Sequence, residues 1–148
     1  MLPERLATDL KQAMRDGDAI RKSAIRMALA GIKNAEKAKG HPLDDSEVID
    51  CLSREAKQHR ESIAEFAKGG RSDLIAKEEA ELAVILEYLP QQMSREEVVA
   101  AARQVVERVG ARGPGDKGKV MSQLMPGLKG KADGREVNEV VSELLAGL

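Results

Sequence analysis

Apolar residues recur every three or four positions along almost the whole chain, and no segment alternates apolar and polar residues as a half-buried β-strand does. The pattern predicts an all-α protein, with an N-terminal four-helix part followed by a small C-terminal three-helix part. The expected helices span residues 2–16, 19–39, 45–68, 71–89, 95–109, 116–125 and 134 onward.

Two segments carry the signature of a capping box, in which a cap side chain and a glutamate three residues later each bond the other's backbone amide. Asp44 with Glu47 is expected to open the third helix, and Ser94 with Glu97 the fifth. The helical pattern is interrupted at Pro90-Gln91-Gln92-Met93. This interruption predicts an N-terminal domain at 1–90 and a C-terminal domain at 94–148.

Only 1% of the residues are aromatic, so the core must be built from Leu, Ile, Val, Ala and Met. Small aliphatic side chains of this kind suit closely packed helices. The expected buried faces include Met14 in the first helix and Met27 in the second. His59 falls on the apolar seam of the third helix, where we expect a packed or half-buried imidazole.

Charge is balanced over the whole chain but not along it. Lys and Arg total 24 against 25 Asp and Glu, so no overall charge favours nucleic acid or a membrane. The net charge is +4 over residues 1–39, −6 over 40–109 and +1 over 110–148. All basic residues of the last segment lie between Arg112 and Arg135. Two basic zones therefore flank an acidic middle.

The single cysteine, Cys51, excludes an internal disulfide and favours a reducing compartment. The first residues lack the uninterrupted apolar run of a signal peptide. No stretch approaches the roughly 20 apolar residues that cross a bilayer. We therefore expect a cytoplasmic protein with no membrane contact.

No catalytic constellation is apparent, and no cofactor is expected. Neither histidine has a second histidine or a cysteine at metal-ligand spacing, so no zinc site is expected. The fourth helix carries an acidic cluster of Glu78, Glu79, Glu81 and Glu87. Paired carboxylates serve general acid–base catalysis, but a solvated face with ion pairs to a neighbouring helix is the favoured interpretation.

The second helix carries a strip of cations. Lys22, Arg26, Lys33 and Lys37 fall within about 60° of one another at 100° per residue. Such a strip suits a phosphate backbone. It equally suits a solvated flank that pairs with the acidic third or fourth helix, and the sequence leaves both interpretations open.

A second candidate site lies in the C-terminal basic zone. Lys117 and Lys119 begin a short helix after a glycine-rich loop, and Lys129 and Lys131 lie in the next glycine-rich loop. Glycines beside lysines let backbone amides and ammonium groups approach one anion. The nucleotide-binding pattern G-x-x-x-x-G-K-[ST] is absent. Phosphate contact is the hypothesis here, and an ordinary solvated loop is the alternative.

Several segments together resemble the GatB/YqeY family, across essentially the whole chain. They are Arg21 to Glu36, Ser53 to Gln58, Glu87 to Pro90, Gly118 to Met121, Leu124 to Pro126, Lys129 to Gly134, Val137-Asn138 and Leu144-Leu145. One setting of this family is the helical tail region of the B subunit of aspartyl/glutamyl-tRNA amidotransferase, which contacts tRNA. The other is a free-standing small protein, which this chain is more similar to.

The resemblance implies that Lys119, Lys129, Lys131 and Arg135 face tRNA, with Lys117, Lys22, Arg26 and Lys33 as weaker matches. It also implies carbon–nitrogen ligase activity with glutamine as amido donor, for which the sequence shows no catalytic residues. The primary hypothesis is a non-catalytic tRNA-binding or amidotransferase-associated module, for which tRNA and a protein partner in tRNA-dependent amidation are the expected partners. The alternative is a protein-interaction module or accessory subunit with no RNA role.

Overall fold

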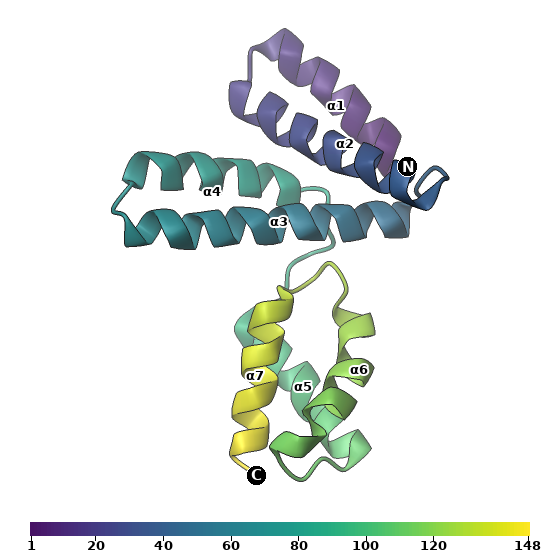
Figure 1. The fold of residues 1–148 in the computed structure, drawn as a ribbon, viewed down its shortest axis with the longest axis vertical. Helices are drawn as coiled ribbons and strands as arrows, with labels where there is room; N and C mark the ends of the chain where they lie inside the picture. The colour runs from purple at the N-terminus through teal and green to yellow at the C-terminus, as the bar shows by residue number, and fades with distance from the viewer. The chain divides into compact units, whose positions relative to one another are not determined.

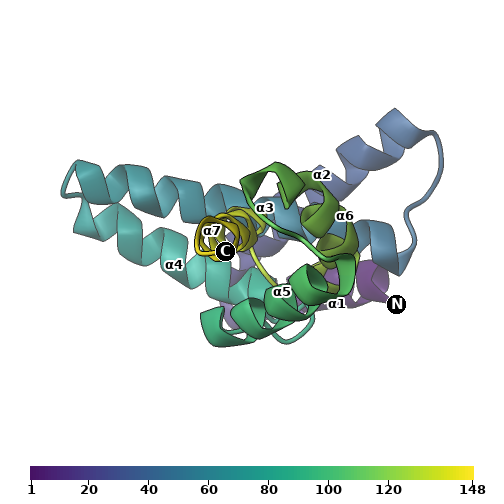
Figure 2. The ribbon, with the colours of Figure 1, turned by 90° about the horizontal axis from the view of Figure 1, so that it is seen from below.

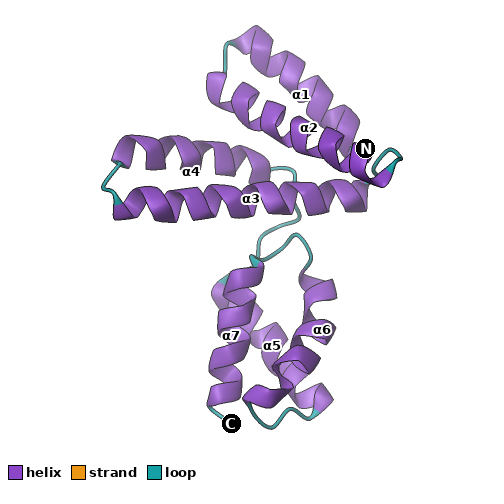
Figure 3. Ribbon diagram, in the orientation of Figure 1, coloured by secondary structure: helices purple, strands orange, loops and turns teal.

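The computed structural model describes residues 1–148, and its regular elements are all helices, which confirms the all-α prediction (Figure 3). None of the helices is long and apolar enough to cross a bilayer. The elements are α1 (Leu2–Asp16), α2 (Ala19–Lys39), α3 (Asp45–Lys68), α4 (Ser72–Leu86), α5 (Arg95–Val109), the 3₁₀ turn η1 (Pro114–Asp116), α6 (Lys117–Leu128) and α7 (Gly134–Ala146).

The chain divides into two compact units, Met1–Pro90 and Gln91–Leu148. In the first unit, α1 with α2 and α3 with α4 form two helical hairpins, and α2 also packs on α3 and α4 (Figure 1). The α3 and α4 helices lie side by side along their length in both views (Figure 2). Their shared core is aliphatic, with Leu6, Ile25, Leu52 and Ile85 fully buried.

The second unit is a three-helix arrangement in which α5, α6 and α7 each pack against the other two. Its core contains only valine, leucine and alanine among its buried residues. Val98 and Ala102 come from α5, Val120 and Leu124 from α6, and Val137, Val140, Val141 and Leu145 from α7.

Both predicted capping boxes are present. The Asp44 carboxylate accepts from the Glu47 amide at 2.8 Å, and Glu47 accepts in return from the Asp44 amide at 3.2 Å. Ser94 and Glu97 exchange the same pair of bonds at the start of α5. The local sequence therefore sets where α3 and α5 begin, because these bonds satisfy amides that the first helical turn leaves without partners.

Two helix ends differ from the sequence-based expectation. The α4 helix ends at Leu86 instead of residue 89, because the next three amides bond carbonyls three residues back and Pro90 disfavours helical geometry at Leu89. The α6 helix continues through Pro126 to Leu128, instead of ending at residue 125. The extra turn costs the hydrogen bond that Pro126 cannot donate, but it buries Leu128 in the second core.

Two methionines expected in the core are exposed instead, Met14 by 52% and Met27 by 45%. The buried face of α2 is centred on Ala24, Ala28 and Ile32. At 100° per residue, Met27 lies about 100° from that centre. Met14 lies about 80° from the face of α1 that buries Leu6. The long flexible side chains therefore reach solvent from the edges of their helices.

Candidate functional site

The α6 helix separates the predicted C-terminal cations into two groups. Lys117 and Lys119 lie in its first turn, whereas Lys129 caps its other end and Lys131 follows. Twelve helical residues at about 1.5 Å each make a helix about 18 Å long. Two lysines at one end and two at the other therefore cannot hold a single phosphate group, although one long polyanion could reach both ends.

The turn between α6 and α7 has a fixed backbone. Its Lys131 carbonyl accepts from the Met93 amide at 2.8 Å, and its Gly130 carbonyl accepts from the Gln92 side chain at 2.7 Å. Gly130 has a positive φ of 73°, which favours glycine at this position. The Asp133 carboxylate accepts from the Arg135 amide and so caps α7 as predicted. These bonds restrict the backbone while the basic side chains stay at the surface.

Lysine and arginine side chains on this turn project into solvent. Lys131 and Arg135 are exposed, and neither makes an ion pair. The carboxylate of Asp133, the acidic residue nearest to Lys131 in sequence, is engaged with the α7 backbone. We call Lys129, Lys131 and Arg135 the lysine turn. The charges of Lys131 and Arg135 are available to an external anion.

The other end of α6 is less open. Lys117 is half-buried and Lys119 is exposed. The preceding Asp116 accepts from the Arg112 amide at 2.8 Å, which closes the glycine-rich loop onto itself. Two cations in the first turn oppose the positive end of the helix dipole. This end is therefore a weaker candidate than the lysine turn.

The cationic strip on α2 faces solvent without acidic partners. Arg26 and Lys33 are exposed and Lys22 is half-buried, and none of the three makes an ion pair. The structure contains no ion pair between this strip and α3 or α4. It therefore does not support the interpretation of the strip as a flank that pairs with those helices. Arg26 and Lys33 also border a shallow depression between α1 and α2 that Leu10 and Leu29 line. The strip belongs to the first unit and the lysine turn to the second.

The segment Glu87 to Pro90, one of those that carry the family resemblance, anchors the first helical hairpin. Glu87 holds Arg21 of α2 through both guanidinium nitrogens, at 2.9 and 3.3 Å. The Tyr88 hydroxyl donates to the Asp9 carboxylate of α1, and the Arg5 guanidinium lies 4.6 Å from the Tyr88 ring centre. Burial and this hydrogen bond raise the pKa of Tyr88 well above its usual range. The segment's role in this structure is to hold α1 and α2 against α4.

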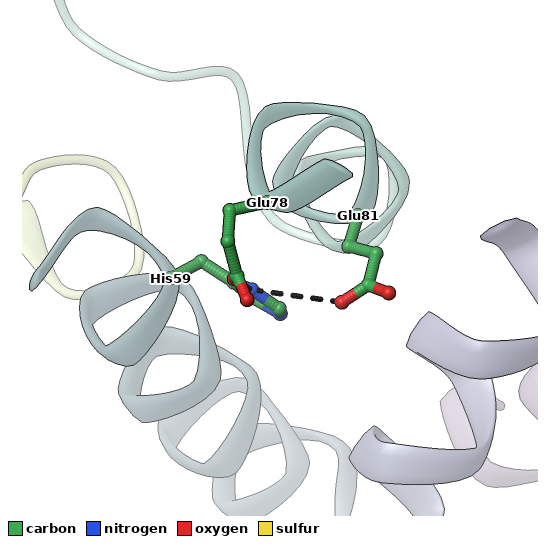
Figure 4. A group of neighbouring side chains, drawn as sticks. All are labelled: His59, Glu78 and Glu81. Carbon is green, nitrogen blue, oxygen red and sulfur yellow. Dashed lines mark hydrogen bonds and ion pairs between the residues drawn. The ribbon is translucent and has the colours of Figure 1, made fainter. Parts of the chain in front are cut away.

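A polar cluster that the sequence analysis did not predict lies between α3 and α4. Figure 4 shows the carboxylates of Glu78 and Glu81 from α4 close to the imidazole ring of His59 from α3. The His59 Nδ1 atom lies 2.6 Å from Glu78 Oε2 and 4.0 Å from Glu81 Oε2. His59 is 3% exposed and Glu81 2% exposed. This cluster is the only place where the two cores bury polar or charged side chains.

A further carboxylate accompanies the cluster one helical turn away. Glu55 precedes His59 by four residues on α3 and lies against α2, where a Cβ added at Gly31 would meet Glu55 Oε1 at 3.3 Å. Burial raises the pKa of the Glu55 carboxyl, and the charge of His59 opposes that change by a smaller amount. The missing side chain of Gly31 gives Glu55 its space between the helices.

The interpretation of the acidic run on α4 as a solvated face with ion pairs to a neighbouring helix agrees with the pairing of Glu78 with His59 of α3 but is wrong for Glu81, which is buried. The sequence does contain a signal for this placement. Residues 78, 81 and 85 are spaced by three and four, so both glutamates share the helical face of buried Ile85. Searching only for cysteine and histidine spacing misses a cluster of one histidine and carboxylates.

A family model for YqeY-like proteins matches residues 3–145. The chain belongs to the YqeY-like family. The resemblance deduced from the sequence is therefore confirmed at the level of the family. The match covers both units, including the lysine turn and the cluster around His59.

Several curated relatives are proteins of yeasts that share the name Altered inheritance of mitochondria protein 41, mitochondrial. The protein of Lachancea thermotolerans is 46% identical over 87 residues, which are 58% of this chain and 46% of the relative. That of Saccharomyces cerevisiae is 42% identical over 87 residues, 58% of this chain and 47% of the relative. The protein of Eremothecium gossypii is 44% identical over 85 residues, which are 57% of this chain and 46% of the relative. The chain spans about half the length of these relatives.

The expectation of a cytoplasmic protein is contradicted by these relatives, whose names place them in mitochondria. The inference failed because its premises do not distinguish compartments. A lone cysteine excludes an internal disulfide and favours a thiol-reducing compartment, but it does not say which one.

Proposed function

We propose that this YqeY-like chain is a non-catalytic module that binds the folded backbone of tRNA through its lysine turn. The observation that carries the proposal is the pairing of a fixed backbone with solvent-facing cations at Lys131 and Arg135. Because the backbone of the turn is already fixed, binding would need to order only the basic side chains and not the loop itself. The cationic strip on α2 would contact further phosphates of the tRNA backbone.

The near absence of aromatic side chains favours structured RNA over a single strand. Single-stranded RNA is bound largely by stacking its bases on aromatic rings. The chain has one Phe, one Tyr and no Trp, and Tyr88 is only 4% exposed and is bonded to Asp9. Contact through phosphates needs only cations, and these are what the surface offers.

Equilibrium binding to bulk tRNA across a salt series tests the proposal. We expect a dissociation constant on the order of micromolar at low salt, with a log–log salt slope of about −0.7 to −0.9 per phosphate contact. The double charge reversal Lys129→Glu with Lys131→Glu should weaken binding at least tenfold and reduce the slope by about two.

The matched control is Arg103→Glu with Arg108→Glu, which changes the net charge equally on exposed positions of α5. It should leave affinity within about threefold. Equal losses in both double variants would mean that only overall charge matters, and unchanged binding after reversal at the lysine turn would refute the site. Failure of the wild-type chain to bind at low salt would instead favour the protein-interaction alternative.

Carbon–nitrogen ligase activity belongs, in this proposal, to an amidation machinery that the chain assists and not to the chain itself. Glutamine hydrolysis and amide transfer to misacylated tRNA should therefore stay at background with the purified chain alone. Turnover above background that follows the chain through purification would contradict the non-catalytic assignment.

A further inference from the structure

The cluster between α3 and α4 contains buried polar atoms without hydrogen-bond partners. They include Nε2 of His59 and Oε1 of Glu81. Both residues are more than nine-tenths buried, and Figure 4 shows the Glu81 carboxylate directed toward the imidazole ring. Unsatisfied buried polar atoms are rare in proteins and often mark a site for an ion or water.

The charges of this cluster do not balance. Glu78 and Glu81 bring two carboxylates, yet no lysine or arginine forms an ion pair with either of them. His59 alone supplies at most one positive charge. Buried charges are costly unless they are paired or coordinate a metal. The arrangement lacks positive charge where the carboxyl groups of Glu78 and Glu81 meet one imidazole.

We propose that His59, Glu78 and Glu81 form a binding site for one divalent first-row transition cation, with Zn²⁺ as the best fit. One atom from each residue lies within 4.8 Å of the other two. An imidazole nitrogen with carboxylate oxygens suits Zn²⁺, Mn²⁺ or Fe²⁺ more than Mg²⁺ or Ca²⁺, which prefer oxygen ligands alone.

The distances suit such an ion with small adjustments. Ligands about 2.0–2.1 Å from zinc stand about 3.4 Å apart in a tetrahedron. The two separations measured from His59 Nδ1, 2.6 Å to Glu78 and 4.0 Å to Glu81, lie on either side of that value. The cation would replace the proton shared by His59 and Glu78, and it would draw Glu81 closer. Three protein ligands leave one position for water.

The competing explanation is a purely structural ion pair between a protonated His59 and Glu78. It requires no metal, and it predicts that added Zn²⁺ finds only weak surface carboxylates. The two explanations therefore differ in stoichiometry, in affinity and in which residues control them.

Metal binding to the full chain, stripped with a chelator beforehand, distinguishes them. Zn²⁺ should compete against a chromophoric chelator with one equivalent per chain and micromolar or tighter affinity. Glu81→Gln and His59→Gln should each weaken binding at least tenfold. Binding by Co²⁺ should give a visible absorption spectrum that changes when the His59 nitrogen is removed.

Matched controls exist for both ligand types. His41→Gln removes the other histidine and Glu79→Gln an adjacent glutamate, both exposed, and each should leave affinity within twofold. Circular dichroism in chelator checks the fold of every variant. If the buried substitutions unfold the chain, Glu78→Gln at the rim, where the side chain is 21% exposed, provides the test. Absence of saturable Zn²⁺ binding, or equal binding in site and control variants, would overturn the proposal.

Discussion

The two units of this chain differ in the side chains that they bury between their helices. In the first, α3 and α4 enclose His59 and Glu81, and polar bonds such as Arg21 to Glu87 and Tyr88 to Asp9 join helices that are distant in sequence. In the second, every buried residue is valine, leucine or alanine. The first unit thus buries polar partners within its core, whereas the polar bonds of the second unit, such as Arg95 to Glu143 and Met93 to Lys131, lie outside an entirely apolar core.

Removal of the His59 imidazole from the polar first core should lower the free energy of unfolding the most. His59→Ala leaves Glu78 and Glu81 facing each other without a partner. We expect the free energy of unfolding in chelator to fall by about 3–5 kcal/mol, the usual cost of breaking a buried pair. Urea unfolding followed by circular dichroism measures it. Replacing all three residues with leucine should recover most of that loss, and a cost of His59→Ala below about 1 kcal/mol would mean that the pair contributes little.

The stability of the apolar second core should depend on the volume of its side chains and not on buried charge. Leu145 is fully buried in α7, so Leu145→Ala should destabilise the chain by about 2–5 kcal/mol through lost burial and a cavity. Leu148→Ala removes the same atoms from a residue that is 64% exposed, and it should change stability by less than about 0.5 kcal/mol. Denaturant midpoints compare the two variants, and similar costs would show that the last helix is not packed as described.

Tyr88 tests a single polar bond of the first unit. Tyr88→Phe keeps the ring but removes the hydroxyl that donates to Asp9, so we expect a loss of about 1.5 kcal/mol. Because Tyr88 is the only tyrosine, an absorbance titration reports its ionisation alone. The raised pKa predicts that tyrosinate appears at higher pH than in a free tyrosine. Ionisation at the ordinary pH in the folded chain would contradict the buried hydrogen bond.

The smallest expected effect concerns the capping box, which is present in both units. In α5, bonds from the backbone and side chain of Ser94 lower the pKa of Glu97 below its usual 4.5. A lowered pKa in the folded state means that the stabilisation is present above the unfolded value and is lost as the pH falls through the folded one. Acid should therefore weaken the start of α5. Glu97→Gln keeps the capping geometry without titrating, so its helical signal should depend less on pH below about 4.5.

Local signals in the sequence predicted much of this fold. The bounds of α1 and α2, and the starts of α3 and α5, follow from apolar spacing and cap residues that act within a few positions. The extension of α6 through Pro126 was not predictable in this way, because burial of Leu128 depends on α5 and α7. The exposure of Met27 was predictable from the sequence, because its angle around the α2 axis places it away from the apolar face.

The candidate sites show the same division between local and tertiary information. The sequence located the cations of the lysine turn, but not their separation from Lys117 by the length of α6. It placed His59 on a buried seam, but the partner carboxylates come from another helix. Charge and periodicity identify which residues are unusual, and only the packing of helices shows which of them meet.

The hydrogen bond from the Met93 amide to the Lys131 carbonyl gives the lysine turn a built-in reporter. That amide exchanges its proton with deuterated water only when the bond opens, so its exchange rate measures how often the turn loosens. An anion that immobilises Lys131 should slow deuterium uptake at Met93. An uncharged residue that makes no contact with the ligand would then record occupancy of the basic surface beside it.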